Sequence, residues 1–85
     1  MGAMPTVTLY GRPGCHLCDD ARAGLERLRA ELGFALEERD IEADDALHRR
    51  YLERIPVIAL DGEELFDFFL DEAELRRRLG RVAGG

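Results

Sequence analysis

Two different periods of apolar residues follow one another along the chain. Thr6–Tyr10 is rich in β-branched and aromatic residues and ends at Gly11, so it predicts a strand that leads into a loop. From Cys15 onward the spacing is helical, and Gly33 supplies a stop. The apolar positions of this predicted helix are Cys18, Ala21, Leu25, Leu28 and Leu32.

The middle of the chain predicts a weaker strand and a short helix. Residues Phe34–Ile41 have the length of a strand but carry charges at its centre. Asp44–Leu52 predicts a helix whose inner face holds Leu47 and Tyr51.

The last third predicts a hairpin followed by a helix. Val57–Leu60 is a continuous apolar run, Asp61-Gly62 is a turn signal, and Leu65–Phe69 completes the hairpin. Asp71 and Glu74 have the spacing of a capping box at the start of the final helix, whose apolar face includes Leu75 and Leu79.

The resulting order β-α-β-α-β-β-α predicts an α/β fold with a four-stranded mixed sheet and helices on both faces. A chain of 85 residues has room for one domain, which we place at residues 5–80. Residues 1–4 are assigned to a start segment or expression remnant, and residues 81–85 to a flexible tail.

Charge and hydropathy exclude two classes of partner. The formal net charge of −6 is opposite to what a phosphate backbone attracts, so we expect no nucleic-acid binding. No stretch approaches the ~18–20 apolar residues of a membrane span, and the first residues lack the pattern of a signal peptide. We therefore expect a cytoplasmic monomer without a membrane partner.

The chemistry of the chain centres on Cys15-His16-Leu17-Cys18. Thiols one helical turn apart have Cα atoms about 5–6 Å from each other, a distance that a disulfide can close. Cys15 lies at the predicted helix N-terminus, where unpaired N–H groups favour the thiolate. Cys18 lies a turn inside on the apolar face. We therefore expect Cys15 to be the attacking nucleophile and Cys18 the resolving thiol.

Neighbouring charges act on Cys15 in opposite directions. Arg12 supplies positive charge, whereas Asp19 and Asp20 add negative charge within about one helical turn. His16 has two open alternatives: it favours the Cys15 thiolate, or it points into solvent.

The two thiols also have interpretations in which they catalyse no reaction. A structural zinc site requires four ligands, and only His16 and His48 remain as nitrogen donors. An inert pair and an iron–sulfur cluster shared between two chains are further alternatives. We favour redox activity without a metal, and keep a non-catalytic metal or iron–sulfur carrier as the alternative.

The segment Tyr10-Gly11-Arg12-Pro13-Gly14-Cys15-His16-Leu17-Cys18 resembles the active-site segment of glutaredoxins, and the resemblance extends over nearly the whole chain. It implies a thioredoxin-like fold of the glutaredoxin type. It also implies a thiol–disulfide oxidoreductase with no bound cofactor other than the Cys15–Cys18 redox couple. Its substrates would be disulfides of proteins or small molecules, and its electron donor a reductase or glutathione.

The resemblance also assigns residues around the cysteines. Ile55-Pro56 occupies the place of the family's cis-proline, with the Ile55 backbone pairing with the substrate chain. Arg12, whose guanidinium can pair with a carboxylate, is expected to bind the substrate. Tyr10 has two open alternatives, the core or the cleft, and the resemblance favours the cleft, where it would modulate the site.

One segment departs from the glutaredoxin pattern. Where dithiol glutaredoxins have a Gly-Gly pair beside the γ-glutamyl end of glutathione, this chain has Phe66-Asp67-Phe68-Phe69. Bulky side chains prevent close approach of the tripeptide, so we expect glutathione to be a poor partner. Any of these aromatic rings left exposed beside Cys15 would form a docking surface.

Overall fold

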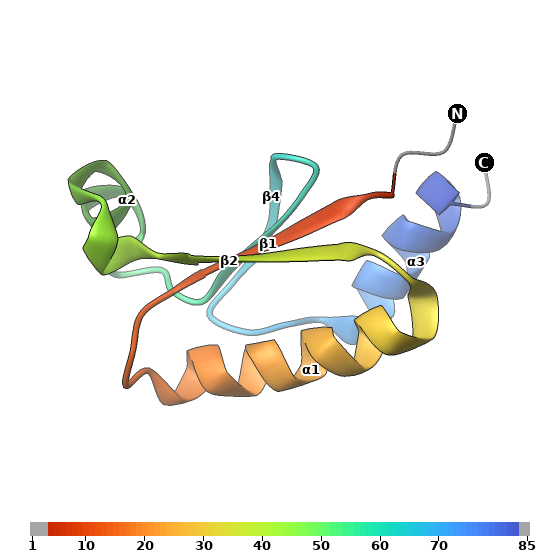
Figure 1. Cartoon of the computed structure of the whole chain (residues 1–85), viewed down its shortest axis with the longest axis horizontal. Helices are drawn as coiled ribbons and strands as arrows, with labels where there is room; N and C mark the ends of the chain where they lie inside the picture. Colours follow the sequence, from red (N-terminus) through yellow and green to blue (C-terminus); the bar gives the residue numbers. More distant parts are fainter. Residues whose placement is uncertain (1–3, 84–85) are drawn as a thin grey trace.

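The computed structural model describes residues 4–83. Its elements are, in order, β1 (Thr6–Gly11), α1 (His16–Leu32), β2 (Ala35–Asp40), the short 3-10 helix η1 (Ile41–Ala43), α2 (Asp45–Tyr51), β3 (Val57–Leu60), β4 (Glu63–Asp67) and α3 (Glu72–Ala83). The strands form one sheet in the order β2-β1-β3-β4 (Figure 1). The predicted order of elements and the four-stranded sheet are confirmed.

The sheet is mixed, as predicted. β1 and β2 are parallel because α1 returns the chain to the edge from which β1 started. β3 runs antiparallel to both β1 and β4. Val7 in β1 pairs with Leu36 on one side and Leu60 on the other, so β1 is an interior strand.

Helices cover both faces of the sheet. Because successive side chains of a strand point to opposite faces, Leu9 and Ile58 belong to one apolar cluster whereas Tyr10 and Val57 belong to another. The larger cluster packs the sheet against α1 and α3, which lie on the same side of it in Figure 1. The smaller cluster packs the other face against η1 and α2, mainly through Ile41 and Tyr51.

Capping residues set both ends of α1. Cys15 is its N-cap residue, with extended backbone angles. Gly33 ends the helix with a left-handed φ of 75°, and its N–H donates to the Arg29 carbonyl at 2.9 Å. Both ends agree with the predicted helix.

The second strand of the hairpin lies closer to the turn than predicted. Asp61 and Gly62 both have positive φ, 49° and 89°, as a tight two-residue hairpin turn requires. β4 ends at Asp67, not at Phe69, because the Phe68 backbone has a left-handed φ of 72°. The Phe68 N–H donates to the carbonyls of Pro56 at 2.8 Å and Arg54 at 3.2 Å instead of continuing the ladder. The expected strand Leu65–Phe69 was therefore wrong at both ends, because β4 starts at Glu63 and ends at Asp67.

The final helix begins as predicted and runs further. The Asp71 carboxylate accepts the Glu74 N–H at 3.1 Å, which is half of a capping box, while the Glu74 carboxylate binds Arg77 and Arg78. α3 continues to Ala83 and so enters the segment assigned to the tail. Residues 1–3 of the assigned start segment and residues 84–85 of the tail lie outside the described residues.

Among residues 4–83, the structure contains no helix with the length and apolar character that crossing a membrane requires.

A polar network joins α2, the loop before β3 and β4. Glu64 accepts hydrogen bonds from Arg54 at 2.6 Å and from the Tyr51 hydroxyl at 2.8 Å. These two bonds, in that order of importance, hold the pKa of Glu64 below its usual value of 4.5. The network fixes the loop that carries Ile55 and Pro56 relative to the hairpin.

Close packing between β1 and α1 leaves room only for glycine at residue 11. A Cβ atom on Gly11 would lie 2.9 Å from the Cys18 sulfur and 3.1 Å from its Cβ, whereas one on Gly24 would lie 2.8 Å from the end of the Leu70 side chain. Cys18 is fully buried, so it cannot move away as the leucine can.

We expect Glu64→Gln to lower the free energy of unfolding near neutral pH, because the ion pair with Arg54 loses its charge. The native-state pKa of Glu64 is depressed, so its contribution is present above pH 4.5 and is lost as the pH falls through the depressed pKa. Urea unfolding of both proteins between about pH 7 and pH 3 measures this. A difference in midpoint that stays constant over that range would contradict the role of the carboxylate.

We expect Gly11→Ala to lower the free energy of unfolding by about 1–3 kcal/mol, because the added methyl group overpacks the contact with Cys18. Gly24→Ala is the matched control, since its alanine improves helix propensity and displaces only the flexible end of Leu70. Urea unfolding of the oxidised proteins measures both. Equal midpoints for the two variants would show that β1 and α1 have more space between them than the structure gives.

Candidate active site

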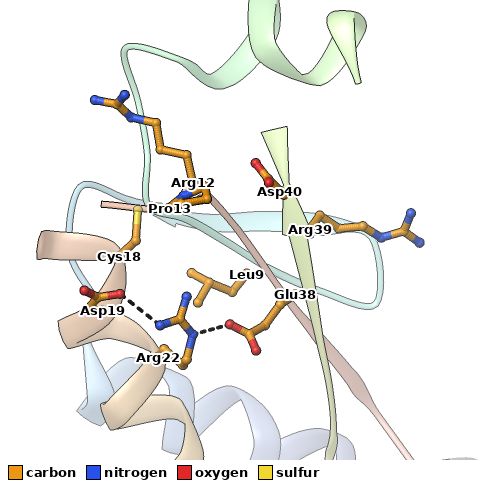
Figure 2. Close-up of a pocket in the computed structure, with 10 residues that line it drawn as sticks. Leu9, Arg12, Pro13, Cys18, Asp19, Arg22, Glu38, Arg39 and Asp40 are labelled. Atoms are coloured by element: carbon orange, nitrogen blue, oxygen red, sulfur yellow. Dashed lines mark hydrogen bonds and ion pairs between the residues drawn. The ribbon is translucent and has the colours of Figure 1, made fainter. Parts of the chain in front are cut away.

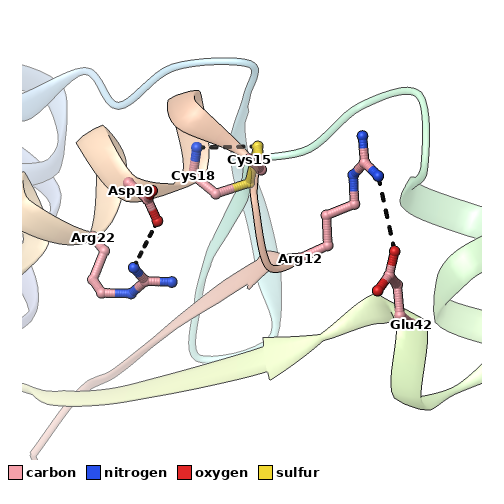
Figure 3. The surroundings of a disulfide bond; sticks show 6 residues. All are labelled: Arg12, Cys15, Cys18, Asp19, Arg22 and Glu42. Carbon is pink, nitrogen blue, oxygen red and sulfur yellow. Dashed lines mark hydrogen bonds and ion pairs between the residues drawn. A yellow bond between two sulfur atoms is a disulfide. The ribbon is translucent and has the colours of Figure 1, made fainter.

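The two cysteines lie at the point where the loop after β1 enters α1. Cys15 and Cys18 form a disulfide with their Cα atoms 5.2 Å apart, within the range expected for thiols one turn apart. The Cys18 backbone N–H points at the Cys15 sulfur at 3.2 Å (Figure 3). In the reduced state the same N–H would stabilise a thiolate on Cys15, as the N-terminus of a helix does generally.

The two sulfur positions differ in access. Cys18 has no exposed surface, whereas Cys15 is partly exposed at the start of the helix. An incoming disulfide can therefore approach Cys15 but not Cys18. This difference agrees with the assignment of Cys15 as the attacking thiol and Cys18 as the resolving one.

The charged neighbours of the pair are directed to other partners. Arg12 extends toward η1, where its guanidinium lies 3.8 Å from the Glu42 carboxylate (Figure 3). His16 is 87% exposed, and its Nε2 lies 3.6 Å from the Asp20 carboxylate. Of the two alternatives for His16, the structure favours the one in which the ring points into solvent.

A pocket of about 400 Å³, lined by both apolar and charged side chains, opens on one side of Cys18, between α1 and the edge strand β2 (Figure 2). Arg22 lies across it and donates to Asp19 at 2.9 Å and to Glu38. These bonds, first the one to Glu38, raise the pKa of Arg22, so its charge is permanent. The negative charge of Asp19, expected to oppose a thiolate, is therefore balanced by Arg22.

The cis Ile55–Pro56 bond that the resemblance implies is present. Pro56 is buried, and its carbonyl accepts the Phe68 N–H, while the adjacent Arg54 binds Glu64 and Asp67. The loop is thus held by the hairpin through both backbone and side-chain bonds.

Tyr10 takes one of its two alternative places. Its ring stacks on Tyr51 with centroids 4.6 Å apart, in the smaller apolar cluster. Tyr51 is buried, which is the main reason that its pKa is raised, with the bond to Glu64 second. Of the two alternatives for Tyr10, the structure favours the core: within residues 4–83, neither the residues lining the pocket at Cys18 nor those lining the pocket at Leu17 include it.

The aromatic segment divides into a packed and an exposed part. Phe66 packs against the larger core cluster, whereas Phe68 and Phe69 are 50% and 66% exposed. With Leu17, they line a second pocket, of about 220 Å³, beside α1. Two aromatic rings of this segment are therefore left exposed, in the pocket that also includes Leu17.

In the described part of the chain, no group of three or more His, Cys, Asp or Glu side chains is arranged to hold a metal ion.

Arg22 and Glu38 are site residues that sequence reasoning missed. The spacing of Asp19 and Arg22 on one helix, three residues apart, was a visible signal for an ion pair. The pairing with Glu38 was not visible, because only the packing of α1 beside β2 brings the two side chains together.

Comparison with solved structures shows the same fold. Protein Ne2328 from Nitrosomonas europaea is 33% identical, with a TM-score of 0.80 over 93% of this chain and 95% of that one. Structural genomics target XcR50 from X. campestris is 38% identical, with a TM-score of 0.72 over 88% and 96%. A thioredoxin mutant from Halobacterium salinarum, 21% identical, has a TM-score of 0.69 over 93% and 74%, a likeness of fold alone.

Comparison with family models gives the same assignment. The model of the glutaredoxin-like domain (DUF836) matches residues 6–80, which include the whole sheet and both cysteines. The fold is thioredoxin-like, as the resemblance of the active-site segment implied. The chain therefore belongs to the glutaredoxin-like domain family (DUF836).

Proposed function

We propose that this protein is a thiol–disulfide oxidoreductase that reduces disulfides with the Cys15/Cys18 pair. The observation that carries the proposal is the difference between the two sulfur positions. Cys15 is the partly exposed N-cap residue and accepts an N–H bond, and Cys18 is buried within reach of it. A structural disulfide would gain nothing from an exposed sulfur at a helix N-terminus.

The proposed reaction transfers two electrons to the substrate. The Cys15 thiolate attacks one sulfur of the substrate disulfide, the substrate S–S bond breaks, and the departing thiolate takes a proton from solvent. Cys18 then loses its proton and attacks the Cys15 sulfur, which releases the second substrate thiol and forms the Cys15–Cys18 disulfide. A donor must supply two electrons to restore both thiols.

The surroundings of the cysteine pair support substrate binding by the loop before β3. Among the described residues, the backbone bonds of this loop involve Arg54 and Pro56 and leave the Ile55 N–H and carbonyl available. In this proposal the Ile55 backbone pairs with the substrate chain as a strand edge does. Arg12, which is paired only loosely with Glu42, attracts a substrate carboxylate.

The aromatic segment, Phe66–Phe69, bears on which electron donor reduces the Cys15–Cys18 disulfide. Phe68 and Phe69 are exposed where a glutathione-dependent enzyme would need a small residue, and the net charge of −6 repels an anionic tripeptide. In this proposal a flavoenzyme resembling thioredoxin reductase is the better donor, and glutathione is a weak one.

We expect the two cysteine variants to behave differently. Cys15→Ser loses the attacking thiolate and should abolish disulfide reduction, whereas Cys18→Ser should accumulate a stable mixed disulfide on Cys15 because no second thiol resolves it. Intact-mass spectrometry after mixing each reduced variant with a small disulfide measures the adduct. Equal rates of alkylation of both thiols in the reduced wild type near pH 7 would contradict the assignment.

The colour and metal content of the wild-type protein, purified without oxygen, distinguish the redox function from the carrier alternative. A colourless protein without stoichiometric metal supports the oxidoreductase. Stoichiometric zinc or iron, lost in both cysteine variants, would support a carrier instead.

We expect a thioredoxin-reductase-like flavoenzyme to reduce the oxidised protein at least tenfold faster than glutathione does, because of the aromatic segment and the acidic charge. NADPH consumption measures both, with thioredoxin reductase in one series and glutathione with its own reductase in the other. Turnover with glutathione that matches a dithiol glutaredoxin in the same assay would contradict this expectation.

A further inference from the structure

An apolar patch begins at Leu17, two residues after Cys15 in the chain. We define it as Leu17, Phe68 and Phe69, which are 51%, 50% and 66% exposed and line the same pocket of about 220 Å³. Leu17 lies between the two cysteines in sequence, so the patch begins at the active-site turn. Large apolar side chains gathered beside a reactive group indicate a binding surface, whereas scattered ones carry no such meaning.

The backbone holds the patch in its exposed position. Phe68 has a φ of 72°, a conformation that favours glycine, and two loop carbonyls fix its N–H. The fold would lose little with a glycine here, because half of the phenylalanine side chain is exposed. Stability of the fold therefore does not account for an aromatic residue at this position.

Acidic residues lie at the rim of the patch. Asp20 and Glu72 line the same pocket. The Asp20 side chain is 66% exposed and has the His16 ring 3.6 Å from its carboxylate. Glu72 is 42% exposed and accepts a hydrogen bond from Arg27 at 3.0 Å, so both carboxylates keep exposed surface. An occupant with a positive charge beside its apolar group complements this rim, whereas the carboxylates of glutathione do not.

We propose that this patch binds the polypeptide segment beside the substrate cysteine and selects protein disulfides that carry a large apolar residue followed by lysine or arginine. The inference rests on the proposed oxidoreductase function and gives it a substrate class. The apolar side chain occupies the space between α1 and the Phe68–Phe69 segment while the substrate sulfur reaches Cys15. The cationic group lies against Asp20 and Glu72.

Three mixed disulfides of one chromogenic thiol, thionitrobenzoate, test the selection. The first carries a short peptide with Leu-Arg beside its cysteine, the second the same peptide with Ser-Gln, and the third 2-mercaptoethanol. The reduced protein is mixed with each, and release of the coloured thiol gives the rate constant. We expect the Leu-Arg peptide to react at least tenfold faster than the Ser-Gln peptide, with the advantage decreasing at high salt.

The variants Phe68→Gly and Phe69→Ser locate the selection in the patch. Glycine suits the φ of residue 68, so the first variant retains the fold, and residue 69 is two-thirds exposed. Each should reduce the Leu-Arg to Ser-Gln ratio at least fivefold. Leu32→Ser is the matched control: it removes an exposed leucine at the far end of α1, about 25 Å from Cys15, and should leave the ratio unchanged.

The outcomes separate this inference from the proposed function. Equal rate constants of the wild type for both peptides, together with rapid reaction of the 2-mercaptoethanol disulfide, would overturn the docking patch and leave the oxidoreductase in place. Absence of reaction with all three would overturn the oxidoreductase itself. If the ratio of the Leu-Arg to the Ser-Gln rate constant stays high in both Phe68→Gly and Phe69→Ser, the selection lies elsewhere on the molecule and the proposed role of the patch is wrong.

Discussion

Burial of the apolar face of α1 against β1 fixes where the two sulfur atoms lie. Leu25 and Leu28 are almost fully buried in the larger cluster, and they set the position of the helix along the strand. Gly11 then allows the end of β1 to approach Cys18 closely. The consequence is a buried sulfur one turn inside the helix and a partly exposed one at its N-cap, which is the arrangement that a dithiol couple requires.

The loop with the cis-proline depends on a second set of contacts, on the other face of the sheet. Arg54 binds carboxylates of β4, Tyr51 binds the same Glu64, and Tyr10 stacks on Tyr51. Hydrogen bonds from charged groups, partly shielded from water, restrict the loop more than exposed ion pairs would. This network therefore orients the backbone of Ile55, which in the proposed function pairs with the substrate chain.

In the proposed function, charge and apolar surface together select the partner. Around the cysteines most charges are paired: Asp19 with Arg22, and Arg12 with Glu42. The distinguishing feature is the exposed surface of Phe68 and Phe69, whose rim carries Asp20, which faces His16, and Glu72, which binds Arg27. In the proposed function, burial of this apolar surface supplies affinity and the exposed rim carboxylates supply selection, which favours a polypeptide over an anionic tripeptide.

The sequence by itself determined the elements, the fold class and the placement of the two cysteines at disulfide distance, because these follow from local spacing: helical period after Cys15, the turn at Asp61-Gly62 and the thiols one turn apart. It also predicted the cis Ile55–Pro56 bond, through the resemblance to glutaredoxins. Only the tertiary structure decided the end of β4, the stacking of Tyr10 on Tyr51 and the bridge from Arg22 to Glu38. Each of these joins residues far apart in the chain, and their meeting depends on how helices and strands pack, which no local pattern encodes.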